Sequence, residues 1–385
     1  MKRKIVIIFV SVLFLLSGCW DENEPERMLY IYGLGIDYKD GKYEVFAQII
    51  DFSMLAKTEQ PNTQATQLEV GHATGTTVDE ALYELYHTLD QQLFWGHLTY
   101  LVLSEEVLKY GNANPIINTF VRYRETRYQT WVYSTQESVK EVMLLTPILN
   151  KGISHSKIAD PMNSYKQESF IEPISLRKLI IRLNEPSYEV NIPLVTIKDN
   201  WSTEKGPDKV ASITGVSVTN PKGFKQTIML DKVRGLQWMT NETKRGEVTV
   251  NLDTNKDNYL TVDVDKINVK VKPITDKGEV MFDINVIMEV TVSGFLSKVT
   301  EDEVRKGVEK EVQKEIEETY KEGLKHDTDI YRLSEYLYRD NVKVWKKVHK
   351  DGKVELTENS IRKITVDVNK VDSGRKSYRD TISEE

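Results

Sequence analysis

An apolar run near the start of the chain limits what the rest of the chain can fold into. Residues 5–16 form an apolar run of twelve, which follows the cations Lys2, Arg3 and Lys4. This order is typical of a secretory signal peptide. The run is too short to cross a bilayer core, which takes about 20 apolar residues. No later stretch resembles a membrane span, so the remaining chain must fold as a globular protein.

The run ends in a lipobox, Leu16-Ser17-Gly18-Cys19, and Cys19 is the only cysteine in the sequence. A lone cysteine cannot form an internal disulfide. In a lipoprotein pathway its thiol is alkylated by a diacylglyceryl group and the chain is cleaved before it. The alternative is an ordinary signal peptide with an accidental cysteine, which accounts less well for this register. We therefore expect removal of residues 1–18 and attachment of the mature protein to a membrane face through acylated Cys19.

Length and charge narrow the class of protein. The 385 residues exceed what one hydrophobic core usually organises, so two or three domains are expected. A net charge of −7 makes the chain a poor candidate for binding nucleic acid or anionic lipid. Basic residues cluster only around Arg122, Arg124 and Arg127, which is too few for a nucleic-acid surface.

The first half of the chain alternates strand and helix patterns. Apolar runs at 29–37 and 43–52, joined by Asp40-Gly41, predict a β-hairpin. Gly33 and Gly35 are interpreted as strand glycines, because the third glycine and the helix of a phosphate loop are missing. A capping box at 77–80 predicts the start of a helix. Further strands are expected at 98–103, 128–133 and 189–197, and further helices at 114–124, 135–145 and 175–183.

The pattern changes after the polar residues 199–208, where Gly206-Pro207 indicates a boundary. Mostly strands follow, and then a capping box at 300–303 opens a long amphipathic helix with apolar residues every fourth position from Val304 to Leu324. A second long helix is expected at 329–348, and a last strand at 361–371.

These patterns predict the fold class α/β (α+β), with several domains of mixed sheets and flanking helices. The expected division is a signal peptide at 1–18, an acylated tether at 19–28, an N-terminal α/β domain at 29–200, a middle β-rich domain at 209–265, a C-terminal α/β domain with two long helices at 266–372, and a tail at 373–385.

The sequence contains no pattern that indicates catalysis, a metal site or a cofactor. The six histidines form no pair three or four residues apart, and H-E-x-x-H is absent. S-x-x-K occurs five times, as chance produces in a lysine-rich chain, without the accompanying K-T-G or S-D-N motifs. We therefore expect a protein that is not an enzyme, with no cofactor and no metal.

Trp95-Gly96-His97 is unusual because bulky aromatic residues flank a glycine just before a buried strand. Two interpretations stay open. In one, Trp95 fills the core and His97 caps the start of the strand. In the other, the segment contacts a partner, since exposed tryptophans often anchor interfaces.

Several short segments, taken in their order and spacing, resemble one known family. They are G-C-W-D at 18–21, Y-G-L-G-I-D at 32–37, G-K-Y at 41–43, F-W-G-H at 94–97, R-G-L-Q-W at 234–238 and the helix-like stretch at 329–347. Together they resemble the spore germination lipoproteins called Ger(x)C, the C subunits of nutrient germinant receptors. The resemblance covers the chain from residue 18 to about 370.

The resemblance implies a three-domain α/β assembly without catalysis, anchored by lipid on the outer face of the spore inner membrane. It implies A-type and B-type membrane subunits of the same receptor as partners. Cys19 matches the acylated cysteine of the family. Arg234 and Trp238 join Trp95, Gly96 and His97 as candidate partner contacts.

Two other classes of function remain as alternatives. A solute-binding lipoprotein would capture a nutrient directly, but such proteins usually alternate strands and helices through two similar lobes. Here the second half differs from the first. An envelope hydrolase has the least support, because no catalytic dyad is visible in the sequence.

Overall fold

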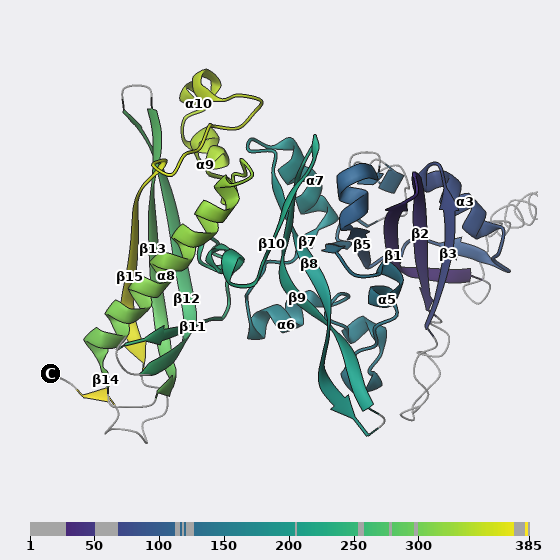
Figure 1. Cartoon of the computed structure of the whole chain (residues 1–385), viewed down its shortest axis with the longest axis horizontal. Helices are drawn as coiled ribbons and strands as arrows, with labels where there is room; N and C mark the ends of the chain where they lie inside the picture. Colours follow the sequence, from purple (N-terminus) through teal and green to yellow (C-terminus); the bar gives the residue numbers. More distant parts are fainter. Residues whose placement is uncertain are drawn as a thin grey trace, which may run out of the picture.

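Two β-sheets, one in each half of the chain, carry the fold (Figure 1). The computed structural model describes residues 28–50, 68–111, 116–117, 119–120, 127–204, 206–252, 258–276, 279–295, 299–372 and 382–383. We call the ten-stranded sheet with its helices, residues 28–229, the N-terminal lobe. The four-stranded sheet with its helices, residues 246–372, is the C-terminal lobe. The lobes lie at opposite ends of the long axis (Figure 1).

The sheet of the N-terminal lobe is mixed. Its strands are β1 Met28–Lys39, β2 Lys42–Ile50, β3 Leu68–Gly75, β4 Gln92–Phe94, β5 Tyr100–Ser104, β6 Trp131–Thr135, β7 Ile174–Ser175, β8 Val190–Thr203, β9 Gly206–Asn220 and β10 Gly223–Met229. The order is β10-β9-β8-β6-β5-β1-β2-β3, with β4 on β1 and β7 on β6. The central strands β1, β5, β6 and β8 run parallel, and hairpins extend both edges antiparallel.

Helices cover both faces of this sheet. They are α3 Val78–Tyr86, α5 Val139–Met143, α6 Pro161–Gln167 and α7 Leu176–Asn184. Leu34 and Ile36 of β1 share a core with α3 and α7, whereas Tyr32 shares the other core with α5. Regular alternation would place all three side chains on one face, but the register of β1 against β2 shifts between Ile31 and Gly33. The α/β layer expected for this half is confirmed.

Both glycines of the G-x-G segment lie within β1, as the strand interpretation predicts. A Cβ on Gly33 would lie 2.3 Å from the Tyr100 ring, and one on Gly35 would lie 2.3 Å from Val139. Glycine is therefore required at both positions, because side chains of the core that contains α5 press against the strand there.

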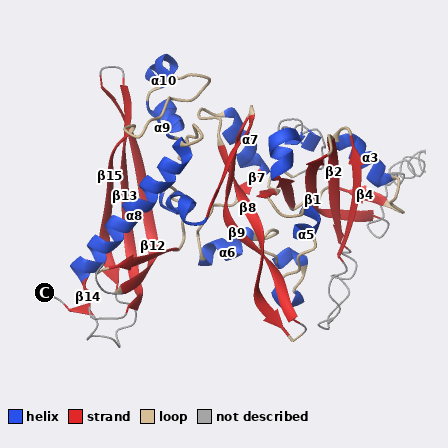
Figure 2. Cartoon of the chain, in the orientation of Figure 1, coloured by secondary structure: helices blue, strands red, loops and turns tan. Residues whose placement is uncertain are grey.

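One long helix packs across the four-stranded sheet of the C-terminal lobe (Figure 2). The elements of the lobe are β11 Gly246–Asn251, β12 Tyr259–Asp276, β13 Glu279–Phe295, β14 Val299–Thr300, α8 Glu301–Leu324, α9 Leu333–Asp340, α10 Val342–Val348 and β15 Ile361–Asp372. Before the lobe comes η5 Leu230–Trp238, and after it comes β16 Ile382–Ser383. The sheet order is β11-β12-β13-β15. Thr300 and Glu303 form the expected capping box, and the apolar stripe from Val304 to Tyr320 is buried.

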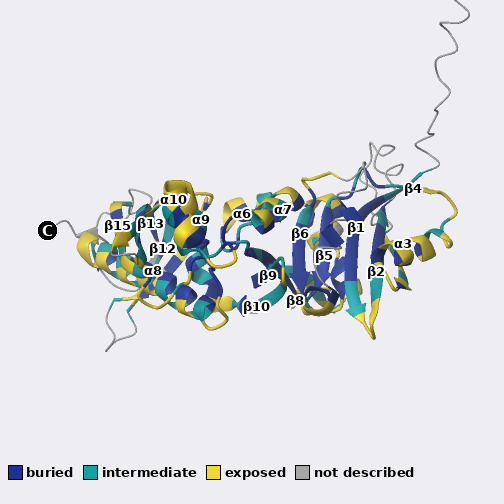
Figure 3. Ribbon diagram, turned by 90° about the horizontal axis from the view of Figure 1, so that it is seen from above, coloured by how far each residue is buried: buried dark blue, intermediate teal, exposed yellow. Residues whose placement is uncertain are grey.

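Buried residues lie mainly in the two sheets, whereas the helix faces that point away from the sheets are exposed (Figure 3). The C-terminal core joins α8 to the sheet and also reaches Val216, Val218 and Ile228 of β9 and β10. The lobes therefore share apolar contacts in addition to the polar ones described below.

Two local expectations about helices differ from the structure. The second long helix is broken at Asn341, whose side chain accepts a hydrogen bond from Val344 N and starts α10 separately. The helix expected at 135–145 is shorter, because Ser138 caps it at Val139. The expected boundary around Gly206-Pro207 lies at the turn of the β8–β9 hairpin, and both strands belong to the ten-stranded sheet. The sheet therefore continues through that boundary, and the division into three domains stays a prediction.

Candidate functional site

The F-W-G-H segment lies at the outer end of the N-terminal lobe, at β4 and the turn after it (Figure 2). Trp95 is 4% exposed, and its Nε1 donates a 3.0 Å hydrogen bond to the hydroxyl of Tyr86. Trp95 thus fills the core, as the first of the two interpretations predicts. Its side chain is not available as an exposed anchor for a partner, whereas His97 stays half-buried at the surface.

Phe94 and His97 form an aromatic group with Tyr30. Ring centroids are 5.8 Å apart for Tyr30 and Phe94, 5.3 Å for Tyr30 and His97, and 5.8 Å for Phe94 and His97. A Cβ on Gly96 would lie 2.6 Å from the Phe94 ring. The glycine of the motif therefore lets the Phe94 ring lie over the backbone.

The R-G-x-x-W segment connects the lobes, because η5 follows β10 and packs on α8. Arg234 Nε donates to Glu315 Oε1 at 2.6 Å, and Trp238 Nε1 donates to Glu315 Oε2 at 2.5 Å. Gly235 N donates to Thr319 Oγ1 at 2.9 Å. Trp238 is fully buried and Glu315 is 6% exposed. We call these five residues the η5–α8 clamp.

The clamp places a carboxylate in the interior and gives it two donors. Burial raises the pKa of Glu315, while Arg234 and the Trp238 hydrogen bond oppose that shift. A Cβ on Gly235 would lie 2.4 Å from the Tyr331 hydroxyl and 2.6 Å from the Glu315 carbonyl oxygen. Removing one partner of a buried ion pair costs more than the pair contributes, so these residues act as internal fastenings of the structure.

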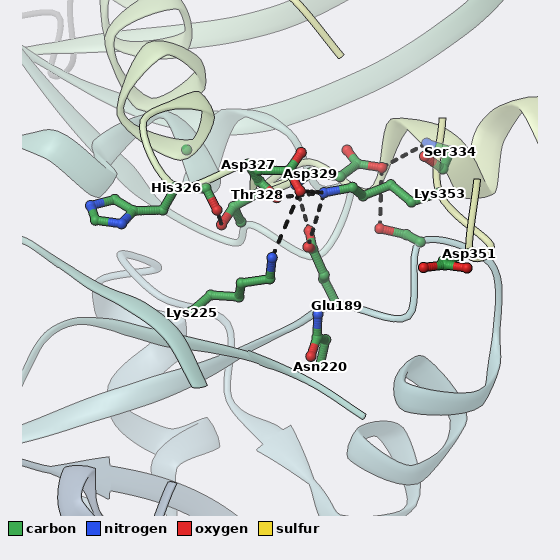
Figure 4. Close-up of polar contacts among 12 residues, drawn as sticks. Glu189, Asn220, Lys225, His326, Asp327, Thr328, Asp329, Ser334, Asp351 and Lys353 are labelled. Carbon is green, nitrogen blue, oxygen red and sulfur yellow. Dashed lines mark hydrogen bonds and ion pairs between the residues drawn. The ribbon is translucent and has the colours of Figure 1, made fainter. Parts of the chain in front are cut away.

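A second polar group joins the lobes at the start of β8 (Figure 4). Glu189 is 2% exposed, and its Oε2 accepts a 2.5 Å hydrogen bond from Asp329 N. Lys353 Nζ lies 3.5 Å from Glu189 Oε1 and 2.8 Å from Asp327 Oδ2. The Asp329 carboxylate accepts a hydrogen bond from Ser187 Oγ at 3.1 Å. We call Ser187, Glu189, Asp327, Asp329 and Lys353 the junction cluster.

Asp329 also holds the start of α9, because its two oxygens accept hydrogen bonds from Leu333 N at 2.6 Å and Ser334 N at 2.8 Å. Arg332, 7% exposed, donates to the carbonyls of Glu189, Arg182 and Pro186. One turn of the C-terminal lobe is thus bonded to the backbone that leads from α7 into β8.

Burial raises the pKa of Glu189 to about 7, although Lys353 opposes the shift. Glu189 Oε1 has no hydrogen-bond partner among the described residues. It lies beside a cavity of about 630 Å³ lined by loops of both lobes, including Tyr188, Lys222 and Asp351. Cavities between lobes are common places for small ligands, so this one is a candidate binding site.

Three further sequence expectations concern chemistry or the membrane. Within the described ranges, no group of three His, Cys, Asp or Glu residues could hold a metal ion. In the same part of the chain, no helix has both the length and the apolar character to cross a membrane. Cys19 and residues 20–27 of the tether expected at 19–28 lie outside the described residues.

The junction cluster was not visible from sequence. Its members come from three separate stretches, and Glu189 and Asp329 are 140 positions apart. The one local signal is Glu189 itself, an acidic residue directly before the apolar start of β8. Arg234 and Trp238 are candidate partner contacts in the sequence, whereas the structure bonds both to Glu315, with Trp238 buried and Arg234 half-buried.

Comparisons with known proteins agree with these features. A family model described as "Spore germination protein N-terminal domain" matches residues 21–197. A second, described as "Spore germination B3/ GerAC like, C-terminal", matches residues 214–374. The first ends within β8 of the N-terminal lobe, and the second begins within β9 and covers the C-terminal lobe.

Individual proteins similar to this chain are also spore germination proteins. Spore germination protein A3 of Bacillus subtilis (strain 168) is 25% identical over 289 residues, covering 73% of this chain and 71% of its own. Spore germination protein KC of the same organism is 22% identical over 366 residues, covering 89% of this chain and 88% of its own.

The crystal structure of the GerBC protein superimposes with a TM-score of 0.55 at 16% identity, covering 89% of this chain and 97% of that chain. This likeness confirms the multi-domain α+β fold. Taken with the two family models, it shows that the chain is a member of the Ger(x)C family of spore germination proteins.

Proposed function

We propose that this protein is a lipid-anchored, non-catalytic subunit of a nutrient germinant receptor, needed for receptor assembly or signalling in spore germination. The observation that carries the proposal is the pair of family models, which together run from residue 21 to residue 374. The partners would be the A-type and B-type membrane subunits of the same receptor. The location would be the outer face of the spore inner membrane.

The lipid anchor rests on the sequence of the first 19 residues. A cationic start, a short apolar run and L-S-G-C in register support acylation of Cys19. Each CH₂ group of an acyl chain that enters the bilayer contributes about 0.8 kcal/mol, so two chains hold a protein far more firmly than one.

A role without catalysis is supported by what the buried charged groups do. Glu189 and Arg332 form hydrogen bonds between the two lobes, and Glu315 holds η5, the segment that connects the lobes, against α8. Such a protein would act through its surfaces on neighbouring subunits.

Replacement of Cys19 by Ala tests the anchor and its importance together. Membrane and soluble fractions of spores carrying Cys19→Ala should show the protein unprocessed or soluble, and nutrient-triggered germination should be impaired. Ser17→Ala, which leaves the lipidated thiol in place, is the matched control. Normal germination with the Cys19→Ala protein free in the soluble fraction would contradict the proposal.

The cavity beside Glu189 favours one second candidate, a subunit that captures the nutrient itself. Its walls come from both lobes, and it contains an acceptor oxygen without a hydrogen-bond partner among the described residues. Titration calorimetry of the soluble mature protein with amino acids, sugars and nucleosides would separate the two. Saturable binding that Glu189→Gln abolishes would favour nutrient capture.

A further inference from the structure

We propose that the outer end of the N-terminal lobe rests on the headgroup region of a phospholipid bilayer through Leu29, Tyr30, Leu93, Phe94 and His97. We call these residues the aromatic edge. The proposal rests on the proposed lipid anchor and adds which surface meets the membrane.

The aromatic edge is built from two short parallel strands. Leu29 of β1 pairs with Leu93 of β4, and Tyr30 pairs with Phe94. All five side chains are half-buried, so part of each is exposed. The inward Trp95 holds the segment by its hydrogen bond to Tyr86, and Gly96 lets the Phe94 ring lie over the backbone.

The length of the tether places this end near the bilayer. Cys19 precedes Met28, the first residue of β1, by nine positions. A fully extended chain spans at most about 3.4 Å per residue, so Met28 must lie within about 30 Å of an acylated Cys19. Because Leu29 and Tyr30 follow Met28 directly, the tether keeps the aromatic edge near the anchor, whereas it places no such limit on the opposite end of β1.

The opposite end of β1 differs from the aromatic edge in its distance from the tether and in its charge. Eleven positions separate Met28 from Lys39, which at about 3.3 Å per residue is up to about 36 Å along the strand. That end carries Lys39, Asp40 and Lys42, all exposed, in the turn to β2. Charged hairpin residues favour water, whereas aromatic rings are enriched at the level of the lipid headgroups.

The charge at the aromatic edge is compatible with lipid. Burial and the nearby Arg127 both lower the pKa of His97, so the ring is neutral at neutral pH. Gln91 and Gln92, which precede Leu93, are exposed but uncharged. An acidic protein is not attracted to anionic lipid. A contact between aromatic side chains and zwitterionic headgroups does not require electrostatic attraction.

The chain offers a direct test, because Cys19 is its only cysteine and acylation would block it. Gln91→Cys, Lys42→Cys and Lys346→Cys each place one free thiol at an exposed position, next to the aromatic edge, at the far end of β1, and on α10. Each acylated, full-length protein is labelled with an environment-sensitive dye and inserted into phosphatidylcholine vesicles that contain spin-labelled lipid quenchers.

We expect quenching at position 91 to exceed quenching at positions 42 and 346 at least threefold. Replacing Phe94 by Ser should lower it toward the control values, with unchanged circular dichroism as the check on folding. Equal quenching at the three positions would overturn the proposal. So would quenching at position 91 that requires native spore membranes, because the surface would then meet a protein.

Failure of the lipid anchor is a separate result. In that case the parent protein would itself take up the dye at Cys19 and would not float with the vesicles. A protein that floats and excludes the dye, but shows no difference between the three positions, contradicts the aromatic edge alone.

Discussion

Glu189→Gln should remove a pH dependence that the buried Glu189 carboxylate gives to the stability of the protein. Burial raises its pKa from an ordinary 4.5 to about 7. The folded state therefore holds its proton more tightly than the unfolded state. The contribution of Glu189 to the free energy of unfolding is therefore greatest below pH 4.5. It is lost as the pH rises toward 7 and stays constant at higher pH.

The magnitude follows from the size of the shift. Each pKa unit corresponds to 1.36 kcal/mol, so a shift of this size corresponds to about 3 kcal/mol between pH 4.5 and pH 7. The glutamine side chain does not titrate. The free energy of unfolding of the variant should therefore lack the decrease that Glu189 causes between pH 4.5 and pH 7, although other groups still titrate.

Urea unfolding of the soluble form, followed by circular dichroism from pH 5 to pH 8, measures the difference. Glu185→Gln is the matched control, since Glu185 lies on the same loop with a side chain that is 38% exposed. The difference in free energy of unfolding between wild type and Glu189→Gln should change by about 2 kcal/mol from pH 5 to pH 8. Parallel curves for those two proteins would refute the reasoning.

Three further substitutions probe the η5–α8 clamp and α8. Gly235→Ala should destabilise the protein by about 1–3 kcal/mol, because the added methyl meets the Tyr331 hydroxyl and backbone; an unchanged urea midpoint would contradict this. Trp238→Phe removes a hydrogen bond to the Glu315 carboxylate and should lower the free energy of unfolding by about 1.5–3 kcal/mol. In a protein that already carries Glu315→Gln, the same substitution should cost much less. Thr300→Ala removes the N-cap of α8 and should lower stability by about 1 kcal/mol, whereas Thr300→Ser should restore most of it.

Features set by neighbouring residues could be predicted from sequence. Asp40-Gly41 predicted a hairpin, and both residues adopt the positive φ that such a turn requires. The Thr300 capping box and the apolar stripe from Val304 to Tyr320 predicted α8 and its buried face. In each case the physical cause, a cap or a helical period, lies within a few residues.

Features set by distant residues could not be predicted. The sequence leaves two interpretations of Trp95 open and offers Trp238 as a partner contact, and only the fold shows that both side chains are buried. Glu189 is one of 59 acidic residues, and only the approach of Asp329 and Lys353 from the other lobe makes it distinctive.

The central claim is that the protein works as a membrane receptor subunit. The most direct measurement is affinity purification of the tagged protein from detergent-solubilised spore inner membranes, with mass spectrometry of everything that remains bound. We expect the A-type and B-type subunits of one receptor in the eluate, together with an N-terminal peptide that begins at diacylglyceryl-modified Cys19. Recovery of the protein alone, with an unmodified Cys19 thiol, would contradict the account.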